Sequence, residues 1–345
     1  MSEVVTDRVS TPPGNAPAIG PNPESLPLLK DLASSIIDFG KREGASAVEA
    51  AASCNEGLSV NVRMGEVETI EHTRDKGMGV TVYIGQRKGS ASTSDFSAQA
   101  IHDTVRAACN IARHASEDPH AGLADEKLLP HHPAALDLDP PWRLTAEQAT
   151  ELATRAEDAR RNANSRISNS ARAGVNRSDA LFVYANSHGF LQGYPSSRQS
   201  LSCTVIAGSA EAMQRDYWYS VARNADALQA PEEIGQMAAQ RTVARLNSRS
   251  LNTRETPVVF QADVARGLFQ NLVGAVRGAS QYRKSSFLLD AAGETLFPGY
   301  MRIHEQPHIP CVLGISAFDS EGVATQARDL VSDGVLRGYV LDSYS

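Results

Sequence analysis

One short segment of the sequence has residue types that could do chemistry by themselves. Residues 304–308 read HEQPH and match the H-E-x-x-H pattern of zinc proteases, in which both histidines bind the metal from one helical face and the glutamate is the general base. Pro307 lies between the histidines, and a proline inside a helix costs about 3 kcal/mol. We therefore expect a strand that leads into a loop here, and we interpret His304, Glu305 and His308 as a chance match with exposed histidines.

A second group of residue types, Ser187, His188 and Asp216, could in principle form a nucleophilic triad. However, the run NSHG at 186–189 has the composition of a hairpin turn, and no G-x-S-x-G elbow occurs. We expect a turn at this place, and we assign no catalytic residue to the chain.

The bulk composition excludes several classes of function. The 345 residues carry a net charge of −7 and only 6% aromatic residues, which argues against a nucleic-acid partner. No run reaches the roughly 18 apolar residues of a membrane span, and the first residues lack the pattern of a signal peptide. Four widely spaced cysteines suggest reduced, mostly buried thiols. We predict a cytoplasmic protein without membrane contact.

The hydrophobic pattern predicts an α+β protein with three folded parts. Residues 1–23 are rich in Pro, Ser, Gly and Asn and predict a flexible tail. A helix, an antiparallel meander of short strands and a helix capped by Ser97 predict an N-terminal α+β domain over 24–115. The strands of the meander are predicted at 58–62, 67–71, 79–84 and 87–92, with a turn at 75–77. A proline-rich connection (116–143) leads to a middle α+β domain over 144–250, in which Thr145 opens a helix with a capping box and Pro231 begins another.

The remaining part, 251–345, predicts a β-rich C-terminal domain. It begins with a predicted strand at 257–260 and a helix capped by Asp263, and Asp333-Gly334 signals a hairpin. The sequence stops directly after a predicted strand, so we expect this domain to be incomplete and to expose an unpaired edge.

Five runs of the sequence together resemble the TldD/PmbA peptidase family. They keep the family's order from about residue 28 to the last residue, and they are RKGSAS (87–92), NSHG (186–189), LQGY (191–194), YRKSSFLLD (282–290) and FDSEGV (318–323). Family members continue past the point where this sequence stops, so the resemblance implies a C-terminally truncated member.

The resemblance also implies a cytosolic zinc metalloprotease formed from two related subunits that acts on unstructured peptides. The TldD-type catalytic subunit carries zinc in an H-E-x-x-x-H helix, and the other subunit has the same fold without that motif. Carried over to this sequence, the helix beginning at Asp263 has Phe269, Gln270 and Gly274 at those three positions. The resemblance therefore implies that this chain binds no zinc itself and pairs with a TldD-type partner, or forms a homodimer when alone.

Two other functions stay open at this point: a binding or regulatory protein without a role in proteolysis, and a stand-alone zinc protease that uses His304, Glu305 and His308. For the helix beginning at Asp263 we expect an inward-facing apolar side made of Phe269, Leu272, Val273 and Val276, because each gains roughly 1.5 to 3 kcal/mol by full burial. The three lost zinc positions should then be buried or pressed against neighbouring strands.

Overall fold

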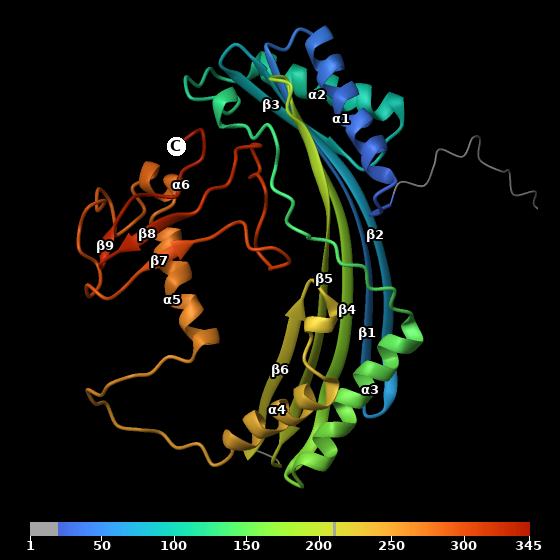
Figure 1. Cartoon of the computed structure of the whole chain (residues 1–345), viewed down its shortest axis with the longest axis vertical. Coiled ribbons are helices and arrows are strands. Elements are labelled where there is room, and N and C mark those ends of the chain that lie inside the picture. Colours follow the sequence, from blue (N-terminus) through green and yellow to red (C-terminus); the bar gives the residue numbers. More distant parts are fainter. Residues whose placement is uncertain (1–19, 210–211) are drawn as a thin grey trace, which may run out of the picture.

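A long antiparallel sheet forms the centre of the protein, as the computed structural model shows for residues 20–209 and 212–345 (Figure 1). Its six strands follow the order β3-β2-β1-β4-β5-β6. The strands are β1 (Ala47–Arg63), β2 (Glu66–Ile84), β3 (Arg87–Thr93), β4 (Ile167–Asn186), β5 (Leu191–Ala207) and β6 (Gln214–Ala222). The sheet is continuous across the two segments for which we predicted an N-terminal and a middle α+β domain.

One face of this sheet is covered by two pairs of helices, one pair at each end. Helices α1 (Ser25–Arg42) and α2 (Ala98–His114) cover one end, and α3 (Ala146–Ala163) and α4 (Pro231–Ala244) cover the other (Figure 1). Alternate residues of β1 are buried along both halves, from Val48 to Cys54 in the first core and from Leu58 to Val62 in the second. A single strand therefore supplies two separate cores, as expected from the period of two in a half-buried strand.

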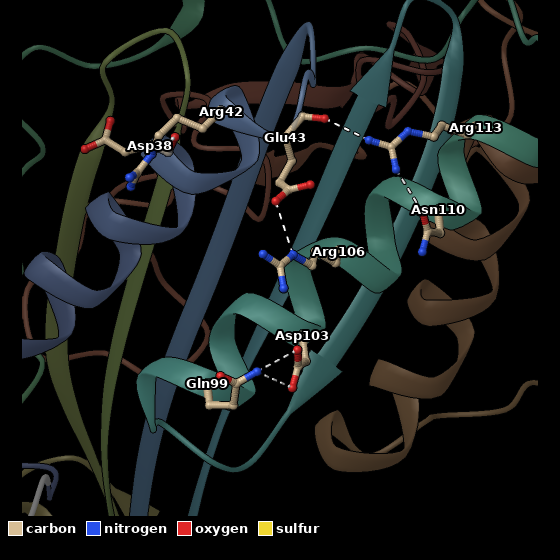
Figure 2. A network of polar contacts seen from close by, with 8 residues as sticks. All are labelled: Asp38, Arg42, Glu43, Gln99, Asp103, Arg106, Asn110 and Arg113. Carbon is tan, nitrogen blue, oxygen red and sulfur yellow. Dashed lines mark hydrogen bonds and ion pairs between the residues drawn. The ribbon is translucent and has the colours of Figure 1, made fainter.

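Polar contacts connect the first helix pair on its outer surface (Figure 2). Glu43, which follows α1, accepts a hydrogen bond from Arg106 at 3.2 Å through its carboxylate and one from Arg113 at 2.9 Å through its carbonyl oxygen. Arg106 is exposed and Glu43 half-buried, so their ion pair contributes little to stability, and the contacts mainly fix how α1 and α2 lie against each other.

The signals for helix starts at Ser97, Thr145 and Pro231 are confirmed. The Ser97 side chain accepts from Ala100 N, Thr145 and Gln148 form a reciprocal capping box, and Pro231 is in the first turn of α4. The β1–β2 turn has Met64 and Gly65 with φ of 56° and 86°, the left-handed pair that a two-residue hairpin turn requires.

The predicted lengths of the strands are wrong. The predicted short strands 58–62, 67–71 and 79–84 are parts of β1 and β2, and the turn expected at 75–77 lies inside β2, where Asp75 pairs with Asn55. The turn was predicted because the middle of both strands is polar. Polar side chains fit a strand here because they are exposed or half-buried and because β1 is paired on both sides, with β2 and with β4.

The C-terminal segment contains α5 (Ala262–Ala275), α6 (Gly278–Tyr282) and a small sheet in the order β7-β8-β9. Its strands are β7 (Ile303–Glu305), β8 (Arg328–Ser332) and β9 (Val335–Leu336). The predicted hairpin is confirmed, since Asp333 and Gly334 connect β8 to β9 with φ of 54° and 77°. The strand predicted at 257–260 is wrong: this stretch has no regular structure, and Val259 is 96% exposed.

The proline-rich connection between α2 and α3 joins the C-terminal segment to the sheet. After the short 3-10 helix η1 (Glu126–Leu128), Leu136 and Leu138 are buried on the face of the sheet that the helices leave open. They pack in one cluster with Tyr184 and Phe190 of the sheet region and Phe318 of the C-terminal segment. This cluster holds residues 315–318 against the sheet.

Two further predictions concern cysteines and membranes. Cys54, Cys109 and Cys203 are buried free thiols, and Cys311 is partly buried, which confirms the predicted state. Among the described helices, none is long and apolar enough to cross a bilayer. Residues 1–19 of the predicted tail lie outside the described residues, while residues 20–25 form a hydrogen-bonded turn before α1.

Candidate functional site

Helix α5, in which the resemblance implies the lost zinc positions, is mostly exposed. Its N-cap is Gln261, so the predicted Asp263 cap is wrong, and Asp263 lies in the first turn instead. Leu272 and Val276 are buried as predicted, but Phe269 is 39% exposed, and Gln270 is exposed as well. The expectation that the former zinc positions are buried is therefore wrong, because only the C-terminal end of the helix meets the small core around β8.

The three α5 residues that the resemblance implies at the lost zinc positions do not offer zinc ligands. Zinc in proteins takes thiolate, imidazole or carboxylate ligands, whereas Phe269 has a phenyl ring, Gln270 a carboxamide and Gly274 no side chain. A Cβ added at Gly274 would meet nothing within 4 Å. These positions are thus accessible but lack the chemistry of a zinc site, and across residues 20–209 and 212–345 no cluster of three or more His, Cys, Asp or Glu residues is arranged to hold a metal ion.

The HEQPH segment is a strand that leads into a loop, as predicted. His304 lies in β7, and both histidines are exposed. The Nδ1 atom of His304 lies 2.7 Å from Asp329, and the Nε2 atom of His308 lies 3.0 Å from the hydroxyl of Thr325. The two rings therefore contact different neighbours, and the helical face on which an H-E-x-x-H site depends is absent from this segment.

The residues considered for a nucleophilic triad are also separated. Ser187 and His188 belong to the turn between β4 and β5, where the Ser187 hydroxyl accepts from Val48 N at 3.1 Å. Asp216 lies on β6 and forms ion pairs with Arg241 and Arg245. The turn prediction is confirmed, and the side chains of Ser187 and Asp216 have structural contacts.

The open face of β4, β5 and β6 carries two adjoining cavities of about 670 and 660 Å³. Arg198, Tyr217 and Tyr219 line both of them. Arg266 of α5 and Gly314 also line the second, so the C-terminal segment forms one wall. We call this surface the arginine trough and define it by Arg172, Arg198, Arg215, Arg266, Tyr217 and Tyr219.

The register of the strands brings the trough residues together. Arg172 on β4 pairs with Thr204 on β5, which pairs with Tyr217 on β6, and Ser202 pairs with Tyr219 in the next row. Hydroxyl groups of β5 therefore form the floor, with tyrosines along the edge strand. Sequence analysis missed this site because its arginines are far apart in the sequence. The alternation of Arg215, Tyr217 and Tyr219 was the one local signal.

Another cavity, of about 600 Å³, lies between the sheet and the C-terminal segment. The hydroxyls of Tyr83 and Tyr184 donate to Glu49 at 3.1 and 2.8 Å. Burial, and then the Glu49 charge, raise the pKa of both tyrosines above the usual range, so both stay neutral donors. Tyr344 donates to Asp118 at 2.7 Å in the same cavity. The three tyrosine hydroxyls therefore each have a carboxylate partner within the structure.

Comparison with known proteins places this fold in a family of metallopeptidases. The PmbA/TldA metallopeptidase domain 1 matches residues 48–112, the central domain matches 139–246, and the C-terminal domain matches 253–345. The chain belongs to the PmbA/TldD metalloprotease family, as the resemblance predicted.

Individual relatives agree with this assignment. The chain is 46% identical over 320 residues to Metalloprotease PmbA of Escherichia coli O157:H7, a match that covers 92% of this chain and 70% of the relative. It is 45% identical over 317 residues to a PmbA homolog of Haemophilus influenzae, again with 92% and 70% covered.

Solved structures show the same fold. A proposed modulator of DNA gyrase from Bacteroides thetaiotaomicron superposes with a TM-score of 0.87 at 23% identity, covering 94% of this chain and 73% of that one. TldE from Thermococcus kodakarensis superposes with a TM-score of 0.76 at 18% identity, covering 91% and 70%. At these identities the likeness concerns the fold alone.

Proposed function

We propose that this chain is the subunit without a zinc motif in a two-subunit metalloprotease that degrades or trims unstructured peptides. The observation that carries this proposal is the composition of α5 in a chain that belongs to a metalloprotease family. The resemblance implies that α5 takes the place of the zinc helix, and this largely exposed helix has Phe269, Gln270 and Gly274 at the three implied positions. The catalytic zinc and its general base would then come from a TldD-type partner.

The arginine trough and the edge of β6 support a role in holding the peptide. Strand β6 is the last strand of the sheet, and among the described residues its only strand neighbour is β5. An extended peptide can add to such an edge through backbone hydrogen bonds, which need little side-chain specificity. Unstructured substrates suit this mode, because their backbone groups are free to pair.

A direct test combines the chain with a TldD-type partner. The chain alone, the partner alone and the co-purified pair are compared for zinc content by elemental analysis and for cleavage of a disordered peptide by mass spectrometry. We expect well under one zinc per molecule and no cleavage for the chain alone, and cleavage by the pair that exceeds that of the partner alone.

Two other outcomes would each select a different function. If the chain binds the partner without changing cleavage, a binding or regulatory role replaces the proposal. If the isolated chain holds stoichiometric zinc and cleaves the peptide, it is a protease by itself, and H304A with H308A then shows whether those histidines bind the metal.

A further inference from the structure

The arginine trough has an excess of positive charge that the described residues do not balance. The two adjoining cavities are lined by six arginines and one carboxylate, and the members are Arg172, Arg198, Arg215, Arg223, Arg245, Arg266 and Asp216. Asp216 is already shared between Arg241 and Arg245, and Arg223 donates to backbone carbonyls. In the described part of the chain, the other four arginines have no ion pair with a carboxylate.

These four arginines form two groups along the trough, one toward each end, and Arg198 lines both cavities. Arg172 on β4 pairs with Thr204 on β5. Tyr217 on β6 pairs with the same threonine, and Arg215 lies two residues before Tyr217. Arg198 lies six residues before Thr204 on β5 and shares the second cavity with Arg266. At about 3.3 Å per residue, six residues of strand separate the two groups by roughly 20 Å.

The surface between the two groups suits an extended chain. Ser200, Ser202 and Thr204 line its floor with hydroxyl groups, and Tyr217 and Tyr219 are 53% and 38% exposed along its side. Outside its pairing with β5, the backbone of β6 makes no backbone–backbone hydrogen bond to another part of residues 20–209 and 212–345. Backbone donors and acceptors thus lie beside a polar, positively charged groove.

We infer that the arginine trough binds an extended acidic peptide whose carboxylates contact the two arginine groups. This inference rests on the proposed function and specifies its substrate class. A peptide strand presents residues i and i+6 on the same face, and their separation of about 20 Å matches the distance between the arginine groups. Guanidinium groups bind carboxylates through two parallel hydrogen bonds, so two such contacts give both affinity and register.

A peptide is the favoured polyanion for two reasons. The open edge of β6 offers backbone hydrogen bonds that a nucleic acid has no means to use in a regular way. The chain as a whole carries a charge of −7, which repels a long phosphate backbone outside the trough.

The test measures binding of fluorescently labelled peptides to the purified full chain by anisotropy. One peptide has two glutamates six positions apart in a neutral, extended sequence, and its matched control has them five positions apart, which puts them on opposite faces of a strand. We expect the six-position peptide to bind about tenfold more tightly than the control, and added salt to weaken it.

Variants locate the binding site. R172A/R215A and R198A/R266A, one pair for each end, should each weaken binding of the six-position peptide about tenfold and remove its advantage over the control peptide. The matched control variant R143A/R283A removes two exposed arginines outside the trough and should leave binding unchanged. Circular dichroism checks that every variant is folded.

The inference is overturned if the two peptides bind equally, if R143A/R283A weakens binding as much as the trough variants, or if single-stranded DNA binds more tightly than the acidic peptide. These results are independent of the protease test. The pair with a TldD-type partner could cleave a neutral peptide although the purified chain shows no preference for the six-position acidic peptide. In that case the proposed function stands and this inference fails.

Discussion

The guanidinium of Arg223 donates from Nε to the carbonyl oxygen of Val312 at 3.0 Å, which joins the end of β6 to the C-terminal segment. Its Nη1 also donates to Ser197 O at 3.0 Å on β5 and to Leu138 O at 3.3 Å in the proline-rich connection. One side chain therefore connects three parts of the chain that are far apart in the sequence.

Replacing Arg223 should loosen this junction. R223A leaves three carbonyl groups without their charged donor, and we expect a loss of about 1 to 3 kcal/mol in the free energy of unfolding. Hydrogen exchange should accelerate around residues 309–318, while the helices α1 and α2 stay protected. R223K keeps the charge but has no planar set of donors, so it should restore only part of the protection. Equal exchange in wild type and R223A would refute the role of this junction.

The buried carboxylate of Glu157 makes stability depend on pH. It accepts hydrogen bonds from the backbone N–H groups of Met64 and Gly65 at 2.8 and 2.7 Å. Burial alone raises the pKa of Glu157, but the nearby Ser170 hydroxyl, these two backbone bonds and the Arg160 charge together outweigh it and bring the pKa below its ordinary value. Because the folded-state pKa lies below the unfolded-state pKa of about 4.3, the ionised carboxylate stabilises the fold at pH values above about 4.3. This stabilisation is lost as the pH falls through the folded-state pKa.

We therefore expect E157Q to lower the free energy of unfolding by about 1 to 3 kcal/mol near neutral pH. In urea titrations at several pH values, the difference from wild type should stay constant above the ordinary glutamate range and shrink below it. E151Q, which changes an exposed glutamate of the same helix, should show neither effect. A difference that grows on acidification would contradict this account.

The hairpin residue Gly334 should tolerate no side chain. Gly334 and Gly314 both have a φ of 77°, so an alanine at either position costs about 1 to 2 kcal/mol for a left-handed backbone. A Cβ at Gly334 would in addition overlap the carbonyl oxygen of Phe297, whereas a Cβ at Gly314 meets nothing within 4 Å.

Thermal unfolding of G334A and G314A separates these two costs. G334A should be less stable than G314A by about 1 to 3 kcal/mol, the typical cost of overpacking. If the two variants melt at the same temperature, the β8–β9 turn adapts and the overlap does not matter.

The histidines of the HEQPH segment should be unimportant for metal content. Asp329, beside His304, has a pKa lowered first by its hydrogen bond from Arg302 and then by its contact with His304, so the His304 ring contacts a side chain of the protein instead of pointing toward His308. H304A and H308A should leave the zinc content and the far-UV circular dichroism spectrum unchanged. A stoichiometric metal that disappears in either variant would show that the motif binds zinc.

Features set by neighbouring residues could be predicted from the sequence. The caps at Ser97 and Thr145, the proline at the start of α4 and the turn at Asp333-Gly334 all follow from local backbone chemistry. The HEQPH segment was also predictable, since Pro307 excludes a helix wherever the segment lies in the fold.

Features that depend on pairing over long distances could not be predicted. The middle of β1 and β2 is polar, and only pairing of β1 with β4 explains why the strands continue there. Helix α5 has an apolar side, but its N-terminal half has no core beside it, so Val264 and Leu268 are 60% and 53% exposed. The arginine trough required the registers of three strands, which no local pattern contains.

The long shared strands have a consequence for protein engineering. Strand β1 belongs to the segment matched by the family's first domain and pairs with β4 of the central domain through a continuous register from Glu49–Asn186 to Val62–Ala173. An excised first domain would expose one flank of a seventeen-residue strand, and the central domain would expose the matching flank, both of which invite aggregation. The two family domains are therefore not exchangeable modules, and chimeras between relatives should keep residues 47–222 from a single parent.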